Sequence, residues 1–238
     1  MKVLRFLIKG KRAHFRRFYT NSSSLTYPVP PPTAVQGLLA AALGLGEEYL
    51  GELKGLWVSA RPTAPLRHAF QTVNYLFLKE GKLEELRGLY REGRTQIPIQ
   101  YLLGEEGRPV AFEVYVASER KGVVELLGNA LANPVYPLAL GPAYALAWAE
   151  GISILEADLR SRWTGTGLGW WEAGKLRLQG TPLGIRLYRD RFPLSLGPGR
   201  QPMRIGELAL EVRGEPLPVQ YEGEVLALGE VAVGVVQV

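Results

Sequence analysis

The stretch from Pro30 to Gly44, P-P-P-T-A-V-Q-G-L-L-A-A-A-L-G, predicts an extended proline segment that leads straight into a helix. Thr33 and Gln36 have the spacing of a capping box, in which two side chains satisfy backbone donors at a helix start. From Val35 onward, apolar residues recur at the spacing of one buried helix face, and Gly44 supplies a stop signal. We therefore expect a capped helix that packs on a core.

The segments around this stretch predict further strands and helices. Before it, the run K-V-L-R-F-L-I-K at Lys2 to Lys9 is typical of a strand, and a basic, aromatic loop follows from Gly10 to Tyr19. This opening favours an α+β fold over an all-β barrel. Beyond it we expect strands near residues 56–60, 72–78, 96–102 and 111–117, a helix over 119–132, and short glycine-punctuated strands after residue 160.

The composition excludes several classes of chemistry. The chain has 238 residues, no cysteine and only two histidines, His14 and His68. Thiol catalysis is therefore excluded, and two distant histidines are too few for the usual zinc sites. The sequence contains no G-x-S-x-G or G-x-x-x-x-G-K-[ST] motif, and we expect no metal and no cofactor. It shows no secretory signal and no apolar stretch that would span a bilayer, so we expect a cytoplasmic protein without membrane contact.

The net charge of +5 is concentrated in two blocks. Residues 1–20 carry seven basic and no acidic side chains, and residues 159–204 carry nine basic against two acidic ones. Residues 18–46, in contrast, hold no charged side chain. Two basic blocks folded onto one face would bind a polyanion, although charge alone favours a solvated surface equally well. The excess of arginine over lysine adds some weight to phosphate binding.

Two motifs resemble one protein family. The opening F-L-I-K-G-K-R-A-H-F-R-R, followed by S-S-S-L-T-Y-P-V-P-P-P-T-A-V-Q-G-L-L-A-A-A-L-G, closely resembles the CRISPR-associated Cas-five family of the RAMP superfamily. A second stretch, N-P-V-Y-P-L-A-L-G at Asn133 to Gly141, is similar to the family's later Pro-Tyr-Pro-x-x-L-Gly element, with Val135 where the first proline would stand. The strong resemblance covers roughly the first fifth of the chain.

The resemblance implies a fold and a function. The implied fold is α+β: an RRM-like, ferredoxin-like domain over residues 1–150, with an antiparallel sheet, packed helices and a thumb-like hairpin or arm around residues 78–110. A β-rich C-terminal region over residues 151–238 packs on it. The implied function is that of a non-catalytic RNA-binding subunit of a type I CRISPR surveillance complex (Cascade), of the type I-B kind, in antiviral defence. Such a subunit grips the 5′ handle of the CRISPR RNA, caps the filament of backbone RAMP subunits, lies against the large subunit and meets target DNA only indirectly.

The candidate RNA-binding residues follow from this implication. Single-stranded RNA is bound by arginine, aromatic and small polar side chains and by backbone amides at helix starts. The set that we expect to contact RNA is Lys11, Arg12, His14, Arg16, Arg17, Tyr19, Asn21, Ser22, Ser23, Thr33, Gln36, Arg160 and Arg162. Within this set Thr33 and Gln36 are first of all structural caps, whereas Phe15 and Phe18 belong to the core.

An enzymatic alternative stays open. Relatives of type I-C are metal-independent endoribonucleases that use a tyrosine, a lysine and a histidine, with the last two adjacent. In this chain the candidate Lys121 is followed by Gly122, which favours a binder without catalytic residues. Tyr19 or Tyr27, with His14 and either Lys11 or Arg12, is the remaining catalytic combination. A generic RRM-like RNA binder outside CRISPR systems is a third reading.

Overall fold

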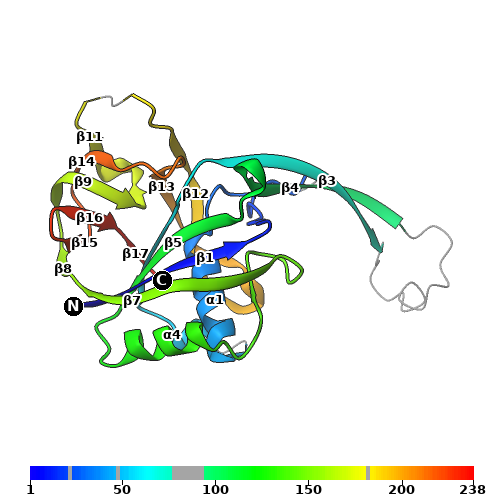
Figure 1. The fold of residues 1–238 in the computed structure, drawn as a ribbon, viewed down its shortest axis with the longest axis horizontal. Helices are drawn as coiled ribbons and strands as arrows, with labels where there is room; N and C mark the ends of the chain where they lie inside the picture. The colour runs from blue at the N-terminus through cyan, green and yellow to red at the C-terminus, as the bar shows by residue number, and fades with distance from the viewer. Residues whose placement is uncertain (21–22, 47–48, 77–93, 181–182) are drawn as a thin grey trace.

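The computed structural model describes residues 1–238 except 21–22, 47–48, 77–93 and 181–182. The chain is α+β, as predicted, and is built around one antiparallel sheet with the strand order β17-β2-β5-β1-β7-β6 (Figure 1). The strands of this main sheet are β1 (Lys2–Gly10), β2 (Trp57–Pro62), β5 (Val110–Ala117), β6 (Leu138–Ala139), β7 (Leu146–Glu156) and β17 (Val236–Gln237).

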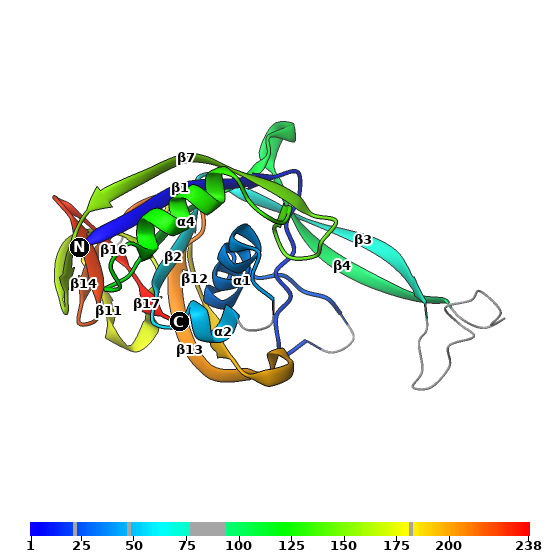
Figure 2. The ribbon, with the colours of Figure 1, turned by 90° about the horizontal axis from the view of Figure 1, so that it is seen from below.

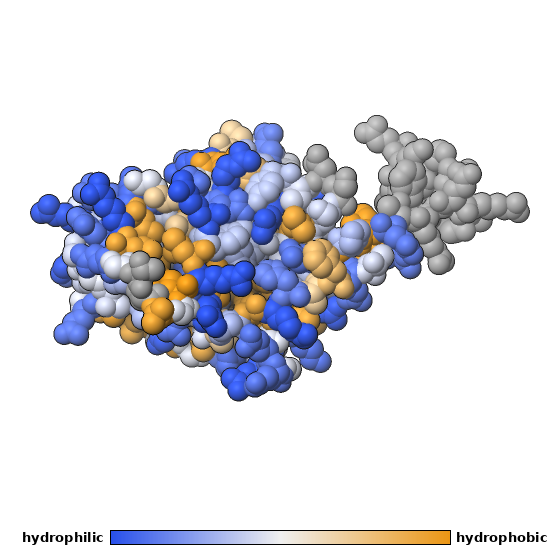
Figure 3. Space-filling view, turned by 90° about the horizontal axis from the view of Figure 1, so that it is seen from above, coloured by the Kyte–Doolittle hydropathy of each residue, from blue (hydrophilic) through white to orange (hydrophobic). Residues whose placement is uncertain are grey.

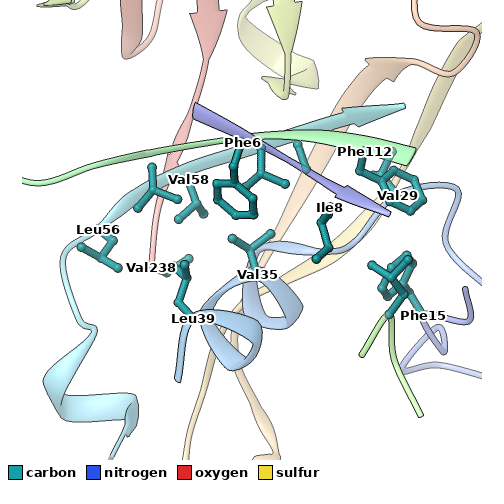
Figure 4. Close-up of a cluster of buried hydrophobic side chains, with 14 of the residues drawn as sticks. Phe6, Ile8, Phe15, Val29, Val35, Leu39, Leu56, Val58, Phe112 and Val238 are labelled. Atoms are coloured by element: carbon teal, nitrogen blue, oxygen red, sulfur yellow. The ribbon is translucent and has the colours of Figure 1, made fainter. Parts of the chain in front are cut away.

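Helices α1 (Pro32–Leu43) and α4 (Val123–Ala132) cover one face of the main sheet, and α2 (Tyr49–Glu52) lies beside α1 (Figure 2). Phe6 and Ile8 of β1 meet Val35 and Leu39 of α1 in the core, where each is at most 2% exposed (Figure 4). The alternation of β1 and the helical spacing of α1 thus produce one shared apolar layer. Along the chain, β1, α1, β2, β5, α4 and β7 form a βαββαβ series.

The prediction of a capping box at the start of α1 is wrong. The helix begins at Pro32, after Pro31, and no side chain caps it. Proline suits the first helical position because its fixed φ is already helical and it has no N–H to satisfy. Gln36 is buried instead, and its Nε2 donates to the carbonyl oxygen of Leu53 at 3.2 Å.

Two smaller sheets follow in the C-terminal part, with strand orders β10-β13-β12 and β11-β14-β9-β16-β15-β8. Val233 and Leu226 from the second of these pack against Trp57 and Tyr115, on the face of the main sheet opposite to the helices. Figure 3 shows apolar and hydrophilic side chains intermixed over these sheets. Their strands are β8 (Asp158–Arg160), β9 (Trp163–Gly169), β10 (Trp171–Glu172), β11 (Leu176–Leu178), β12 (Leu187–Leu196), β13 (Pro202–Glu211), β14 (Leu217–Tyr221), β15 (Val225–Leu228) and β16 (Val231–Gly234). Short 3-10 turns lie at Ala173–Lys175 and Pro198–Arg200 in this part, and at Glu105–Gly107 before β5.

The main sheet draws strands from both of the predicted regions. Strand β7 runs through residue 150, so the expected boundary between residues 150 and 151 falls inside a strand. Strand β17, at residues 236–237, returns to pair with β2. The two regions therefore share one sheet.

A hairpin of β3 (Leu66–Leu76) and β4 (Arg94–Gly104) projects from the body (Figure 1). Strand β3 begins at Leu66, earlier than the predicted 72, and β4 extends beyond the predicted 96–102 at both ends. Most described side chains of β3 are exposed or half-buried, so the sequence lacks the alternation that marks a half-buried strand. Residues 77–93, which belong to the predicted thumb at 78–110, lie outside the described residues.

The second motif, Asn133 to Gly141, wraps the end of α1. The backbone N–H groups of Val135 and Tyr136 donate to the carbonyl oxygens of Ala42 and Ala41, at 3.0 and 3.1 Å. A proline at position 135 would have no N–H to donate, so this chain gains a helix-end hydrogen bond at the position where it departs from the family pattern.

The same motif ends at a close backbone contact. Gly141 has φ 106°, and a Cβ built on it would lie 1.9 Å from the carbonyl oxygen of His14. Only glycine permits this approach. The two motifs are thus physically coupled, since the second fits against the basic segment of the first.

We predict that Gly141→Ala lowers the free energy of unfolding by about 2 kcal/mol or more, because it adds both a clash and an unfavourable φ. Chemical denaturation measures the change. The control is Gly37→Ala in α1, where a Cβ meets no atom within 4 Å, and there we expect no loss or a gain of up to about 1 kcal/mol. Equal stability of the two variants would contradict the coupling of the motifs.

Candidate nucleic-acid interface

The segment after β1, which we call the basic segment (residues 11–26), is hydrogen-bonded to the part of β4 nearest the body of the molecule. Ala13 and Leu102 exchange two backbone hydrogen bonds, of 3.1 and 2.8 Å. The Gln100 N–H donates to the Ser24 carbonyl at 2.9 Å. Phe15 is buried against Phe112, as the sequence predicts, with ring centroids 5.7 Å apart. The segment therefore has a fixed path that separates buried from exposed side chains.

His14 is buried, contrary to the expectation that it faces RNA. Its Nδ1 donates to the Gln100 carbonyl at 2.7 Å, which leaves Nε2 to accept a hydrogen bond from the Ser24 hydroxyl at 2.9 Å. Burial lowers the pKa of His14, and the charge of Arg16 acts in the same direction. The imidazole is therefore neutral at pH 7 and bonds to the chain through both nitrogens, so it ties the basic segment to β4.

Three cations of the segment remain available. Arg12 Nη1 donates to Gln71 Oε1 at 3.3 Å, and its guanidinium lies 5.6 Å from the ring centre of Tyr101. Arg16 Nη2 donates to the Thr20 carbonyl at 3.0 Å. Among the described residues, neither of these side chains nor Lys11 forms an ion pair with a carboxylate. A bound anion would supply their missing counter-charge.

Arg17 and Tyr19 behave differently, because Asp190 engages both. The Tyr19 hydroxyl donates to Asp190 Oδ2 at 2.6 Å, and Arg17 Nη1 lies 3.6 Å from the same oxygen. The Tyr188 hydroxyl also donates to Asp190, while Arg191 lies over the Tyr19 ring, 5.5 Å from its centre. The expected RNA contacts at positions 17 and 19 are thus part of a network that fixes the segment to β12.

A groove of about 1410 Å³ runs between the basic segment, the start of α1, residues 136–146 and the turn between β12 and β13. None of the described residues that line it is acidic, and Arg16 and Arg200 are its only cations within that part of the chain. The remaining wall is uncharged and largely apolar, with Pro30, Pro31, Leu38 and Leu196 among its members. Such a wall suits nucleobases, and the two guanidinium groups suit phosphates.

Arg200 occupies an unusual backbone position. It has φ 60°, in the left-handed region that disfavours residues with a Cβ. Two backbone hydrogen bonds hold this turn: Arg200 N–H donates to Gly197, and Gly197 N–H donates to Gln201, at 3.0 and 2.9 Å. The turn therefore holds a strained arginine in the groove wall, as is common at functional sites.

The other predicted site residues divide by location. Thr33 lines the groove but is mostly buried, Ser23 is half-buried, and the buried Gln36 donates to the carbonyl oxygen of Leu53. Asn21 and Ser22 lie outside the described residues.

Arg160 and Arg162 are not brought to the groove. Arg160 closes strand β8, which Figure 1 places at the end of the molecule away from the hairpin. There Arg160 pairs with Asp158 at 3.3 Å and lies over the Trp163 ring. The two basic blocks therefore meet only in part: Arg191 and Arg200 join the first block, and Arg160 and Arg162 do not.

Sequence reasoning missed two tyrosines at the hairpin end of the groove. Tyr75 of β3 and Tyr144, in the loop before β7, both line the groove and are 43% and 51% exposed. No local signal marks them, because they come from separate elements that only the tertiary fold brings together.

The described residues contain no group of three or more histidine or acidic side chains placed to hold a metal ion. No helix among them has the length and apolar character needed to cross a membrane.

Comparisons with known proteins agree with this architecture. A crystal structure of a CRISPR protein from Archaeoglobus fulgidus is similar over 100% of both chains, with a TM-score of 0.64 and 12% identity. A chain of a CRISPR RNA-guided surveillance complex is similar over 97% of this chain and 93% of its own length, with a TM-score of 0.54 and 17% identity. These likenesses show the fold, and no curated protein matches the sequence.

The family comparison extends over more of the chain than the two motifs. The model for the family described as CRISPR-associated protein (Cas_Cas5) matches residues 3–157, well over half of the sequence. The match takes in the basic segment, α1, the hairpin and the Asn133 to Gly141 motif. The chain belongs to the CRISPR-associated Cas-five family.

Proposed function

We propose that this chain is a non-catalytic RNA-binding subunit of a type I CRISPR surveillance complex, of the type I-B kind, that grips the 5′ handle of the CRISPR RNA in the groove. It would act in the cytoplasm, cap the filament of backbone RAMP subunits and contact the large subunit. Family membership and the likeness to a chain of a surveillance complex support this assignment. The observation that carries it is the groove with Arg16 and Arg200 in its wall and no acidic side chain among its described residues.

The topology supports an RRM-like domain. The βαββαβ series with strand order β2-β5-β1-β7 is the order of a ferredoxin-like fold. The hairpin supports a thumb role, because a two-stranded ribbon is marginally stable in water unless something packs on it. In this proposal the guide RNA and the adjacent subunit cover the ribbon.

The endoribonuclease alternative receives little support from the geometry. Tyr27 is fully buried, its hydroxyl donates to the Arg191 carbonyl at 2.6 Å, and burial raises its pKa. Tyr19 is engaged by Asp190, and both ring nitrogens of His14 are occupied. Tyr19, Tyr27 and His14, the catalytic combination left open by the sequence, therefore present no free base and acid around one position in the groove.

We predict that Arg16→Glu and Arg200→Glu each weaken binding of the 5′-handle RNA about 10-fold or more, and reduce the slope of log affinity against log salt by about 0.7 per lost phosphate contact. Fluorescence anisotropy over a salt series measures both quantities. Arg162→Glu is the matched control, since it makes the same charge change at the far end of the molecule. An equal loss in all three variants would show that overall charge, and not the groove, determines binding.

We further predict that the purified protein, incubated with its own CRISPR repeat RNA in EDTA, binds the RNA without cutting it. Gel analysis of end-labelled RNA checks this outcome. A specific cut that His14→Ala abolishes would establish the endoribonuclease instead.

A further inference from the structure

Three tyrosines lie together at the hairpin end of the groove. The Tyr101 and Tyr144 hydroxyls lie 2.7 Å apart. Burial raises the pKa of Tyr75, and Tyr144 is close enough to act in the same direction. We call Tyr75, Tyr101 and Tyr144 the tyrosine cluster. Its members come from β3, β4 and the loop before β7, so three separate parts of the chain hold them together.

The cluster has a buried base and two exposed rings. Tyr101 is 3% exposed and packs edge-on against Tyr144, with ring centroids 6.5 Å apart. Tyr75 and Tyr144 stay about half exposed. The hydroxyl bond to Tyr101 holds the Tyr144 ring, and pairing of β3 with β4 holds the backbone of Tyr75, so both rings lie in the groove wall with ring surface uncovered. Fixed aromatic rings bind flat ligands at little entropic cost, because few rotatable bonds must be ordered.

The charge around the cluster favours an anionic ligand. Arg12 lies over the Tyr101 ring, and its charge also acts on Tyr144. Arg16 is close enough to Tyr75 that its charge opposes the rise in the pKa of that hydroxyl. Neither arginine pairs with a carboxylate in the described part of the chain. A ligand with a flat aromatic face and a neighbouring negative charge complements both features.

We infer that Tyr75 and Tyr144 form a stacking site for one unstacked base of a single-stranded nucleic acid, with Arg12 and Arg16 beside its phosphates. This inference rests on the proposed function and adds a specific base-binding position at the root of the hairpin. A proline-rich peptide also packs on aromatic rings, but it offers no anion for the two arginines. The nucleic acid is therefore the ligand that uses every group at the site.

The test uses the full chain and handle RNAs in which 2-aminopurine replaces one base at a time, because stacking quenches the fluorescence of this base. We expect quenching at one position in the wild-type complex. Tyr144→Leu should abolish that quenching and weaken binding about 5- to 100-fold, the usual loss for one base–aromatic stack. Tyr144→Phe should retain both the quenching and most of the affinity, because it keeps the ring.

Trp148→Leu is the control, since Trp148 is a 43% exposed aromatic residue of β7 that does not line the groove, and we expect it to retain both the quenching and the affinity. If Tyr144→Phe loses as much RNA affinity as Tyr144→Leu, the effect belongs to the Tyr144 hydroxyl and not to its ring, and the stacking site is overturned. Unchanged binding and quenching in Tyr144→Leu would also overturn it, while leaving the proposed function standing. If the wild-type chain binds handle RNA no better than a scrambled RNA, the proposed function itself fails. Binding of a proline-rich peptide that Tyr144→Leu abolishes, without RNA quenching, would replace the nucleic acid as ligand.

Discussion

Gln100 of β4 joins the hairpin to the basic segment, and the candidate interface depends on this joint. Its carbonyl accepts from His14 Nδ1, its N–H donates to the Ser24 carbonyl, and its Oε1 accepts from the Thr26 N–H at 3.1 Å. One residue thus fixes the segment at two points ten or more residues apart. The basic segment held in this way forms one wall of the groove. The tyrosine cluster lies next to the same joint, because Tyr101 follows Gln100 in β4.

The placement of carboxylates decides which arginines are free to bind a ligand. Glu113 lies between Arg5 and Arg61, 2.6 and 2.7 Å from their Nε atoms, and is almost completely buried. Asp190 engages Arg17 in the same way. These two acids pair with arginines outside the groove, and none of the described residues that line the groove is acidic. No described carboxylate there would repel a phosphate that approaches Arg16 and Arg200.

Much of the fold can be predicted from the sequence, because burial on one face leaves a periodic pattern. Strand β1 alternates from Arg5 onward, β5 is a short, nearly continuous buried run, and α4 shows an apolar face that ends at Asn133. The start of α1 is mispredicted because the helix begins at Pro32, directly after Pro31, without a side-chain cap. The described hairpin strands are longer than predicted because the side chains of β3 are mostly exposed and leave no periodic pattern.

The candidate site is less predictable, since its geometry depends on distant partners. Arg12 and Arg16 could be identified from the motif; Arg16 is exposed and Arg12 is half-buried. Tyr19 instead pairs with Asp190, 171 positions away. His14 is buried with both ring nitrogens bonded, because the Gln100 carbonyl accepts from Nδ1 and the Ser24 hydroxyl donates to Nε2. No pattern within either segment contains that information.

The central claim is that RNA lies in the groove beside the basic segment. Cross-linking of CRISPR RNA that carries 4-thiouridine in its 5′ handle, within the assembled complex, tests it most directly. Mass spectrometry of the linked peptides should place the links in residues 11–24, 136–146 and 193–202. Links confined to residues 158–163, at the opposite end of the molecule, would contradict the account.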